Sequence, residues 1–258
     1  MRGLTEENGG ASVAKGRHFL FLAGGGKMSY TERQMQKIEA NRTKLTAQEE
    51  IAGRKAILAR NLIGIEAIKI DVEKPFTFTS GIKSPIYCDM RALSSHPMIR
   101  SVFYNYLTDL VVQQCGGDPW VAGTATAGII PGFYVANSLQ TPMFYVRSQN
   151  KGHGTKSRVE GGDVKGKILV VVEDLITTGG SLIETVHALR EEGAFVHKVF
   201  SIFNYGFSYA KDAFKSNEIK CSSLLSFHDM IAAINLKKEE DDVLQKWWAG
   251  RNKALLEK

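Results

Sequence analysis

The stretch ILVVVEDLITTGGS, residues 168–181, decides the fold of this chain. Its opening part, Ile168–Val172, is apolar and mostly β-branched, which predicts a strand buried on both faces of a sheet. Two carboxylates, Glu173 and Asp174, follow at the carboxyl end of that strand. The small residues of Thr177–Ser181 then lead into a predicted helix and let the backbone approach a ligand closely.

This order of strand, acid pair and small-residue loop predicts a site for a phosphorylated sugar. A helix N-terminus offers unpaired N–H groups to an anion, and the acid pair suits sugar hydroxyls or a metal ion. A plain turn with two solvated acids is the alternative, because short glycine-containing loops between strands and helices are common. The spacing matches neither the G-x-x-x-x-G-K-[ST] phosphate loop nor the G-x-G-x-x-G dinucleotide fingerprint.

The composition fits one sizeable domain and excludes several classes of protein. The chain has 258 residues, 43% of them hydrophobic, and a net charge of +6. That charge suits a phosphorylated substrate as well as nucleic acid, and without a run of basic residues we expect no nucleic-acid partner. Three distant cysteines, Cys88, Cys115 and Cys221, indicate a reducing compartment, so we expect a cytoplasmic protein. No apolar run approaches the ~18 residues of a membrane span, so we expect no membrane partner.

The chain divides into an extension and a folded domain. Residues 1–45 are rich in glycine and lack apolar periodicity, so we expect a disordered N-terminal extension. Met1 and Met28 both remain candidate start residues. The domain is expected over residues 46–258. From Trp120 onward its strands alternate with helices, which predicts an α/β fold with a parallel central sheet flanked by helices.

The individual elements follow from periodicity and from turn residues. We predict helices over 46–65, from Pro97 onward, and over 129–139, 181–192, 209–214, 227–235 and 240–249, strands over 120–123, 143–146, 168–172, 196–203 and 221–225, and a hairpin-like element over 75–91. The helix from Pro97 has a predicted core-facing stripe of Ile99, Val102, Phe103, Tyr106 and Leu110. The pair Trp247–Trp248 is predicted to pack against the core.

Three loops leave predicted strands at the carboxyl edge of the sheet, where ligands bind in such folds. They cover residues 124–128, 147–161 and 173–181. The second is long, polar and without periodicity, and such loops are usually functional or disordered. Its basic residues include Arg147, Lys151 and His153. We therefore expect the three loops to converge on one site.

Several segments resemble a known family. The segment Phe76–Arg91, FTFTSGIKSPIYCDMR, is similar to the N-terminal signature of orotate phosphoribosyltransferases. The pattern R-x-x-x-K-x-H-G from Arg147 resembles their mobile catalytic loop, and residues 168–181 resemble the loop with which type I phosphoribosyltransferases bind phosphoribosyl diphosphate (PRPP). The resemblance extends from about residue 50 to residue 250.

The resemblance implies a fold, a reaction and an assembly. The fold would be the type I phosphoribosyltransferase fold, with a small N-terminal hood element beside the sheet. The reaction would transfer the phosphoribosyl group of PRPP to orotate, giving orotidine 5′-monophosphate and pyrophosphate. Mg²⁺ would be held mainly by pyrophosphate and ribose oxygens and by water, with no dedicated protein ligands. In the family, loop residues reach the neighbouring active site, which implies a homodimer with shared active sites.

The resemblance also implies the roles of individual residues. The expected catalytic residues are Lys151, Glu173 and Asp174. The expected PRPP-binding residues are Arg147, Lys151, His153, Glu173, Asp174, Leu175, Ile176, Thr177, Thr178, Gly179, Gly180 and Ser181, and the expected orotate-binding residues are Lys83, Tyr87 and Thr177.

The chain departs from the family pattern at three places. Ser148 stands where many members have a second lysine, and Thr79 stands where many have a lysine before Ser-Gly. The segment FNYGF, residues 203–207, lacks the arginine that holds the orotate carboxylate in some bacterial members. The residue that contacts this carboxylate is therefore unassigned.

Two other functions remain as alternatives. A phosphoribosyltransferase for a purine base would have the same phosphate loop, but the segment Phe76–Arg91 and the K-G-H-G loop argue against it. A PRPP-sensing regulator would need a DNA-binding module. Residues 1–45 show no helix-turn-helix pattern, so they do not supply one.

Overall fold

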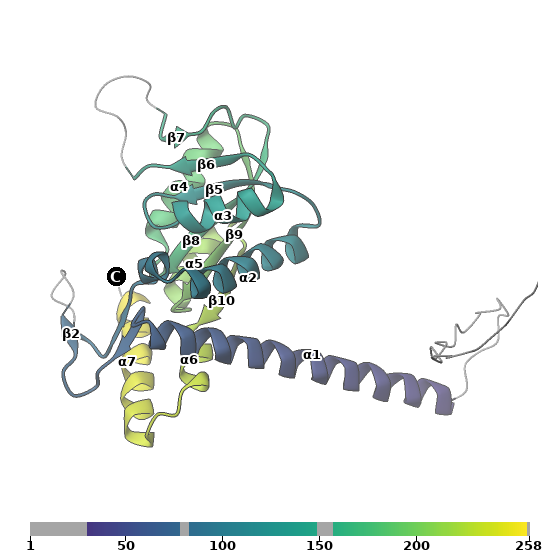
Figure 1. Cartoon of the computed structure of the whole chain (residues 1–258), viewed down its shortest axis with the longest axis vertical. Helices are drawn as coiled ribbons and strands as arrows, with labels where there is room; N and C mark the ends of the chain where they lie inside the picture. The colour runs from purple at the N-terminus through teal and green to yellow at the C-terminus, as the bar shows by residue number, and fades with distance from the viewer. Residues whose placement is uncertain (1–29, 78–82, 149–156, 257–258) are drawn as a thin grey trace, which may run out of the picture. The chain divides into compact units, whose positions relative to one another are not determined.

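The structure is a computed structural model, shown in Figure 1. It describes residues 30–77, 83–148 and 157–256. The chain falls into two units, Met1–Thr46 and Ala47–Lys258. The described part of the first unit is the beginning of helix α1, and the second unit holds the sheet and the remaining elements.

Helix α1 spans Tyr30–Gly64 and begins well before the predicted start at residue 46. The expected disordered extension over residues 1–45 is therefore corrected for residues 30–45, which are helical. Glutamate, glutamine, lysine, arginine and alanine dominate this segment, and they favour a helix without any apolar stripe. Apolar periodicity was thus the wrong signal here. Residues 1–29 lie outside the described residues, so the expectation there stays a prediction.

A six-stranded sheet in the order β10-β9-β8-β5-β6-β7 forms the centre of the second unit. Its first five strands are parallel, and β7 pairs antiparallel with β6 at the edge. The strands are β5 (Trp120–Thr124), β6 (Met143–Val146), β7 (Val159–Glu160), β8 (Ile168–Ile176), β9 (Phe195–Asn204) and β10 (Cys221–Ser226). The predicted fold class is confirmed. Only β7 had no predicted counterpart, because its two residues lie within the polar segment 147–161.

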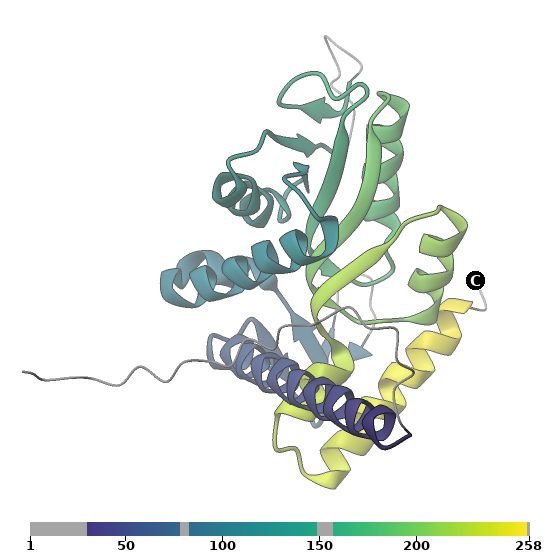
Figure 2. The same ribbon diagram turned by 90° about the vertical axis from the view of Figure 1, so that its right-hand side faces the viewer.

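Helices cover both faces of this sheet, as Figures 1 and 2 show. Residues of α2 and α3 pack with one face of the central strands, and residues of α4 and α5 pack with the other. The helices are α2 (Pro97–Cys115), α3 (Ile129–Leu139), α4 (Gly180–Glu191), α5 (Ser208–Ser216), α6 (Phe227–Ala233) and α7 (Lys238–Leu256). Val170, Val171 and Val172 of β8 have no exposed surface, as expected for a strand covered on both sides.

The buried face of α2 differs from the predicted stripe. Val102 is 38% exposed, whereas Tyr104, Leu107 and Val111 are buried together with Phe103. The face toward α3 and β9 is thus centred about one position later than the sequence indicated. The reason is that α2 also has apolar residues on its exposed face, among them Met98 and Val112. Apolar periodicity alone therefore could not show which face of the helix is buried.

The hood consists of two short antiparallel pairs. Strand β1 (Ile68–Ile70) pairs with β4 (Ile86–Cys88), and β2 (Phe76–Thr77) pairs with β3 (Lys83–Ser84). The predicted hairpin-like element is thereby confirmed, and a 3₁₀ helix, η1 (Met90–Ser95), follows it.

Helix α7 connects the hood to the body of the domain. Trp247 donates its indole N–H to the Lys83 carbonyl at 3.3 Å, and Trp248 donates to the Tyr205 carbonyl at 2.7 Å. Both tryptophans pack against the core, as predicted.

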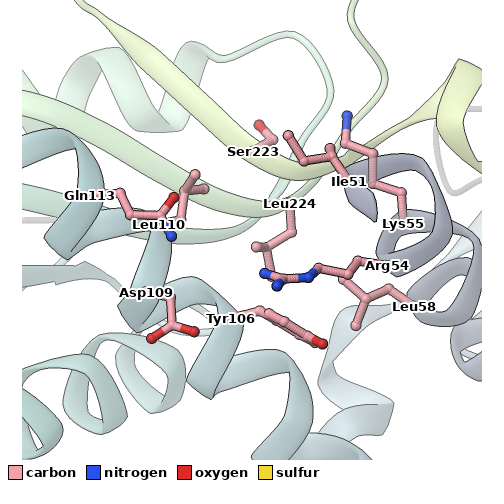
Figure 3. Close-up of a pocket in the computed structure, with 10 residues that line it drawn as sticks. All are labelled: Ile51, Arg54, Lys55, Leu58, Tyr106, Asp109, Leu110, Gln113, Ser223 and Leu224. Carbon is pink, nitrogen blue, oxygen red and sulfur yellow. The ribbon is translucent and has the colours of Figure 1, made fainter. Parts of the chain in front are cut away.

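A small pocket lies between α1, α2 and β10, and we call it the helix pocket (Figure 3). Its volume is about 130 Å³. The guanidinium of Arg54 lies 5.6 Å from the ring centre of Tyr106, and Lys55 forms an ion pair with Asp229 at 2.9 Å. Both cations therefore already have protein partners. We interpret the pocket as part of the packing interface between α2, β10 and the portion of α1 from Ile51 to Leu58.

Candidate active site

The acid pair lies inside strand β8 instead of after it. The strand was predicted to end at Val172, but its pairing with β9 continues to Ile176, which faces Asn204. The two acids line the same cavity but differ in exposure. Glu173 is 7% exposed, whereas Asp174 is half-buried.

The loops after β5 and β8 meet in a cavity of about 350 Å³, which we call the cradle cavity. Its lining residues are Thr124–Ala127 and Glu173–Leu182. The structure therefore brings together all the predicted residues from Glu173 to Ser181, and it confirms that segments 124–128 and 173–181 converge. The hydroxyls, amides and carboxylates of this lining suit a phosphorylated sugar.

Two glycines allow the backbones to come this close. Gly179 has a φ of 80°, and a Cβ there would lie 2.5 Å from the Phe214 ring. A Cβ on Gly128 would lie 2.5 Å from the carbonyl oxygen of Val172. Helix α4 begins directly after Gly179, so its unpaired N–H groups and positive dipole end lie at the cavity. This is the geometry of an anion cradle.

Glu173 carries an electrostatic cost in the cradle cavity. Its Oε1 accepts a hydrogen bond from the Asp174 backbone N–H at 3.0 Å. Burial raises the pKa of Glu173 well above its usual value, and the adjacent Asp174 carboxyl raises this pKa further. A ligand that brings hydroxyl donors or positive charge would offset the cost of holding two carboxylates together.

A second cavity of about 290 Å³ adjoins the first, and we call it the side cavity. Both cavities are lined by Thr126, Ala127 and Asp174. The remaining walls of the side cavity are Met90, Arg91, Ser94, Tyr104, Ile130, Pro131 and Ile202. Largely apolar walls with a single guanidinium suit a flat anion.

The three other predicted site residues that the structure describes lie outside both cavities. Arg147 donates to the Ser157 carbonyl at 3.0 Å and lies 3.0 Å from Glu160, so it holds the two ends of the long loop together. Lys83 is exposed on β3. The Tyr87 ring lies 5.8 Å from that of Phe76 on the hood. None of Lys83, Tyr87 or Arg147 lines either cavity. Lys151 and His153 lie outside the described residues.

The sequence prediction gave no role to Arg91, which lines the side cavity. Two residues before it, Asp89 accepts hydrogen bonds from its side chain. The D-x-R spacing at the end of FTFTSGIKSPIYCDMR was the available signal, because a carboxylate two residues from an arginine can fix its guanidinium.

Comparison with known proteins places the chain in a family. Residues 105–222 match the phosphoribosyl transferase domain family. A mostly parallel six-stranded sheet with helices on both faces is the fold of this domain family.

The chain is 44% identical over 186 residues to the orotate phosphoribosyltransferase of Staphylococcus saprophyticus, covering 72% of this chain and 90% of that protein. It is 42% identical over 192 residues to that of Oceanobacillus iheyensis, covering 72% and 95%. The crystal structure of the Aeropyrum pernix orotate phosphoribosyltransferase matches with a TM-score of 0.58 and 31% identity, over 68% of this chain and 96% of that one. This chain belongs to the orotate phosphoribosyltransferase family.

None of the helices in the described ranges is long and apolar enough to cross a membrane. Within the same part of the chain, no group of three or more His, Cys, Asp or Glu side chains could hold a metal ion.

Proposed function

We propose that this chain transfers the phosphoribosyl group of PRPP to orotate, giving orotidine 5′-monophosphate and pyrophosphate in pyrimidine synthesis. Membership of the family supports this reaction. The main structural support for this reaction is the cradle cavity, which is lined by both the acid pair and the first residues of α4. The side cavity beside Asp174 offers room for the base.

In this reaction N1 of orotate forms a bond to C1 of the ribose, while the bond from C1 to the pyrophosphate oxygen breaks. Orotate loses its N1 proton, and pyrophosphate leaves with the bonding electron pair. The transition state carries positive charge on the ribose, so catalysis requires positioning and charge stabilisation more than a protein nucleophile.

The residues of the cradle cavity divide these tasks. The segment Thr177–Ser181 would hold the 5′-phosphate with its backbone N–H groups and hydroxyls, and Thr177 would also contact orotate. Asp174 and Glu173 would accept hydrogen bonds from the ribose hydroxyls. Their negative charge would then face the developing cation and stabilise it.

Mg²⁺ fits this donor set. The cavity offers carboxylates and hydroxyls, the hard oxygen ligands that Mg²⁺ prefers, and the described residues of its lining include no histidine or cysteine. When bound to pyrophosphate and ribose oxygens, the ion would neutralise the leaving group. The protein residues would act on it indirectly, through the substrate that they hold.

The long loop would supply the remaining positive charge. Lys151 and His153 would cover the pyrophosphate. Arg147 stands at the base of this loop, where its contacts with Ser157 and Glu160 fix the point at which the loop leaves β6.

A homodimer with shared active sites is the assembly that we propose. Exposed apolar side chains on α2 and α3, two helices that contact each other, support it, because exposed apolar surface marks interaction sites. Met98 is 82% exposed, Phe133 60%, Ile130 47% and Val102 38%. Ile130 also lines the side cavity, so a partner on this face would lie next to the site.

Mixing two inactive variants tests the shared site. Lys151→Ala and Asp174→Asn subunits should restore activity in hybrid dimers, because one site then has an intact acid pair and an intact loop from its partner. Random mixing makes half the dimers hybrid, so about a quarter of wild-type activity should return. If mass spectrometry confirms exchange and no activity returns, the loop acts within its own subunit.

The absorbance change of orotate on addition of PRPP and Mg²⁺ tests the reaction itself. Turnover of orotate, with none of hypoxanthine or guanine, is the expected result. Turnover of a purine base would assign a different reaction, and PRPP binding without turnover of any base would favour a regulator. The free cysteines fit a cytoplasmic location, which fractionation of the source cells would test.

A further inference from the structure

Orotate presents a recognition problem that the cradle cavity does not solve. Its carboxylate is attached to the ring carbon next to N1, the atom that attacks the ribose. A cation that binds this carboxylate must therefore lie close to the ribose site, beside the acid pair. The segment FNYGF, residues 203–207, offers no arginine or lysine for this purpose.

Arg91 is the one described cation in the right place. Among the described residues that line the cradle cavity and the side cavity, it is the single lysine, arginine or histidine. It shares the side cavity with Asp174, whose charge acts on the Arg91 guanidinium. Asp174 in turn lines the cradle cavity, where the ribose is expected. Arg91 is thus on the base side of the acid pair.

The contacts of Arg91 leave one edge of its guanidinium open. Its Nε donates to Asp89 Oδ1 at 2.6 Å, and its Nη2 donates to Asp89 Oδ2 at 2.7 Å. A guanidinium is a planar fork with five N–H donors, so the edge made by Nη1 and the second Nη2 hydrogen still has two donors. The Arg91 side chain is 68% exposed, which keeps that edge accessible to a ligand.

Asp89 is itself held in place. Its Oδ1 accepts from the Arg91 backbone N–H at 3.0 Å at the start of η1, and its own N–H donates to the Ala67 carbonyl at 2.7 Å. These contacts fix the carboxylate that orients the guanidinium. Hydrogen bonds from Arg91 hold the pKa of Asp89 below its ordinary value, so the pair stays ionised at neutral pH.

We propose that Arg91 binds the orotate carboxylate through its open Nη1–Nη2 edge, and that Asp89 is the positioning residue that aims it. This inference rests on the proposed function and adds the residue that selects the base. A bidentate contact between carboxylate and guanidinium strengthens binding of orotate and offers nothing to uracil, which has the same ring without the carboxylate. Arg91 therefore determines specificity.

Steady-state kinetics of Arg91→Ala and Arg91→Lys, with orotate and PRPP varied separately, test the proposal. We expect the KM for orotate to rise about tenfold to a hundredfold in Arg91→Ala, the range for loss of charge-assisted hydrogen bonds, with the KM for PRPP within about twofold. Arg91→Lys should recover only part of this loss, because an ammonium cannot form the bidentate contact. Asp89→Asn should raise the KM for orotate by a few-fold.

Inhibition by uracil distinguishes a contact with the orotate carboxylate from a general structural effect of the Arg91 substitutions. Measured as a competitive inhibitor against orotate, it should bind wild type and Arg91→Ala equally. The matched control is Arg60→Ala, which removes the same charge from an exposed position on α1 that lines neither cavity. This control should leave both KM values unchanged.

The outcomes separate this inference from the proposed function. Wild-type turnover of orotate establishes the function whatever the variants do. An unchanged KM for orotate in both Arg91 variants would overturn the inference alone, as would equal weakening of orotate, uracil and PRPP. Lack of wild-type turnover with orotate, together with turnover of another base, would overturn both.

Discussion

The cradle cavity and the helix pocket are both lined by polar side chains, yet only the first is organised for a ligand. In the helix pocket Arg54 lies over Tyr106 and also forms an ion pair with Glu50, while Lys55 contacts Asp229. Protein groups satisfy these charges, and apolar residues fill most of the remaining wall.

In the cradle cavity, by contrast, neighbouring carboxylates repel each other. Two carboxylates, Glu173 and Asp174, lie side by side, and burial raises the pKa of the first. The backbone N–H groups at the start of α4 have no partner within their own helix. A ligand site therefore differs from a packing groove in having charged and polar groups that the protein itself does not pair. Volume, or the presence of charged side chains alone, distinguishes the two less well.

The largest predicted effect is that of Asp174→Asn, which keeps the shape of the site and removes a charge that faces the developing cation. Turnover should fall about a hundredfold to a thousandfold, the scale of losing one preorganised electrostatic contact. Affinity for PRPP should weaken less than turnover. Stopped-flow or steady-state rates with purified variant check this, and near-normal turnover would reject the role of Asp174.

Gly179→Ala should have the next largest effect, because the new Cβ would meet the Phe214 ring at 2.5 Å in a backbone conformation that favours glycine. We expect stability to fall by about 1–3 kcal/mol and the KM for PRPP to rise. Chemical denaturation measures the first effect. Gly180→Ala is the matched comparison for stability, since a Cβ there meets nothing within 4 Å. Equal stability of the two variants would contradict the packing argument.

Asp229→Asn should weaken the attachment of α1 without affecting the chemistry. Asp229 accepts a hydrogen bond from the Ser226 backbone N–H at 2.9 Å, as part of a capping box, and another from Lys55 at 2.9 Å. We expect a loss of about 1–2 kcal/mol at neutral pH, with turnover unchanged. A fall in turnover with no loss of stability would place this contact in the functional machinery.

The pH dependence of that loss follows from the pKa of Asp229. Burial alone raises this pKa, but hydrogen bonds from Ser226 and Lys55 outweigh it and leave the pKa below its ordinary value. A depressed folded-state pKa contributes stability above the unfolded pKa, and this contribution disappears as pH falls through the folded value. The difference between wild type and variant should therefore shrink in acid. A difference that grows in acid would contradict this assignment.

The smallest predicted effect is that of Arg54→Ala in the helix pocket. Its contact with Tyr106 is a partly exposed cation–π interaction, worth about 0.5–1 kcal/mol. Melting temperature should fall slightly, and both KM values should stay the same. A change of several-fold in either KM would show that the helix pocket communicates with the cradle cavity, and the contrast between the two would fail.

The sequence was sufficient for the parts of the fold in which local pattern and tertiary context agree. The strand from Ile168, the hairpin around Lys83 and the helix after Gly128 all appear where the pattern placed them. Burial of the strand begins at Leu169, since Ile168 at its first position is 61% exposed. The acid pair and the cradle were also predictable, because the strand, the two acids and the small-residue loop follow one another in a single short segment of sequence.

The sequence was insufficient where neighbours decide the outcome. The buried face of α2 depends on how α3 and β9 meet it, so Val102 was misplaced. Strand β8 extends through Glu173 because β9 continues to pair with it, which no local signal shows. Arg91 was missed because its meaning depends on a cavity built from η1, α2, α3 and β8.

A crystal structure with PRPP and Mg²⁺ bound would show directly whether the cradle cavity holds the substrate. We predict the 5′-phosphate against the backbone of Thr178–Ser181 and the ribose hydroxyls on Asp174, with the helix pocket empty. Electron density for PRPP anywhere other than the cradle cavity, or a 5′-phosphate away from the start of α4, would contradict the account.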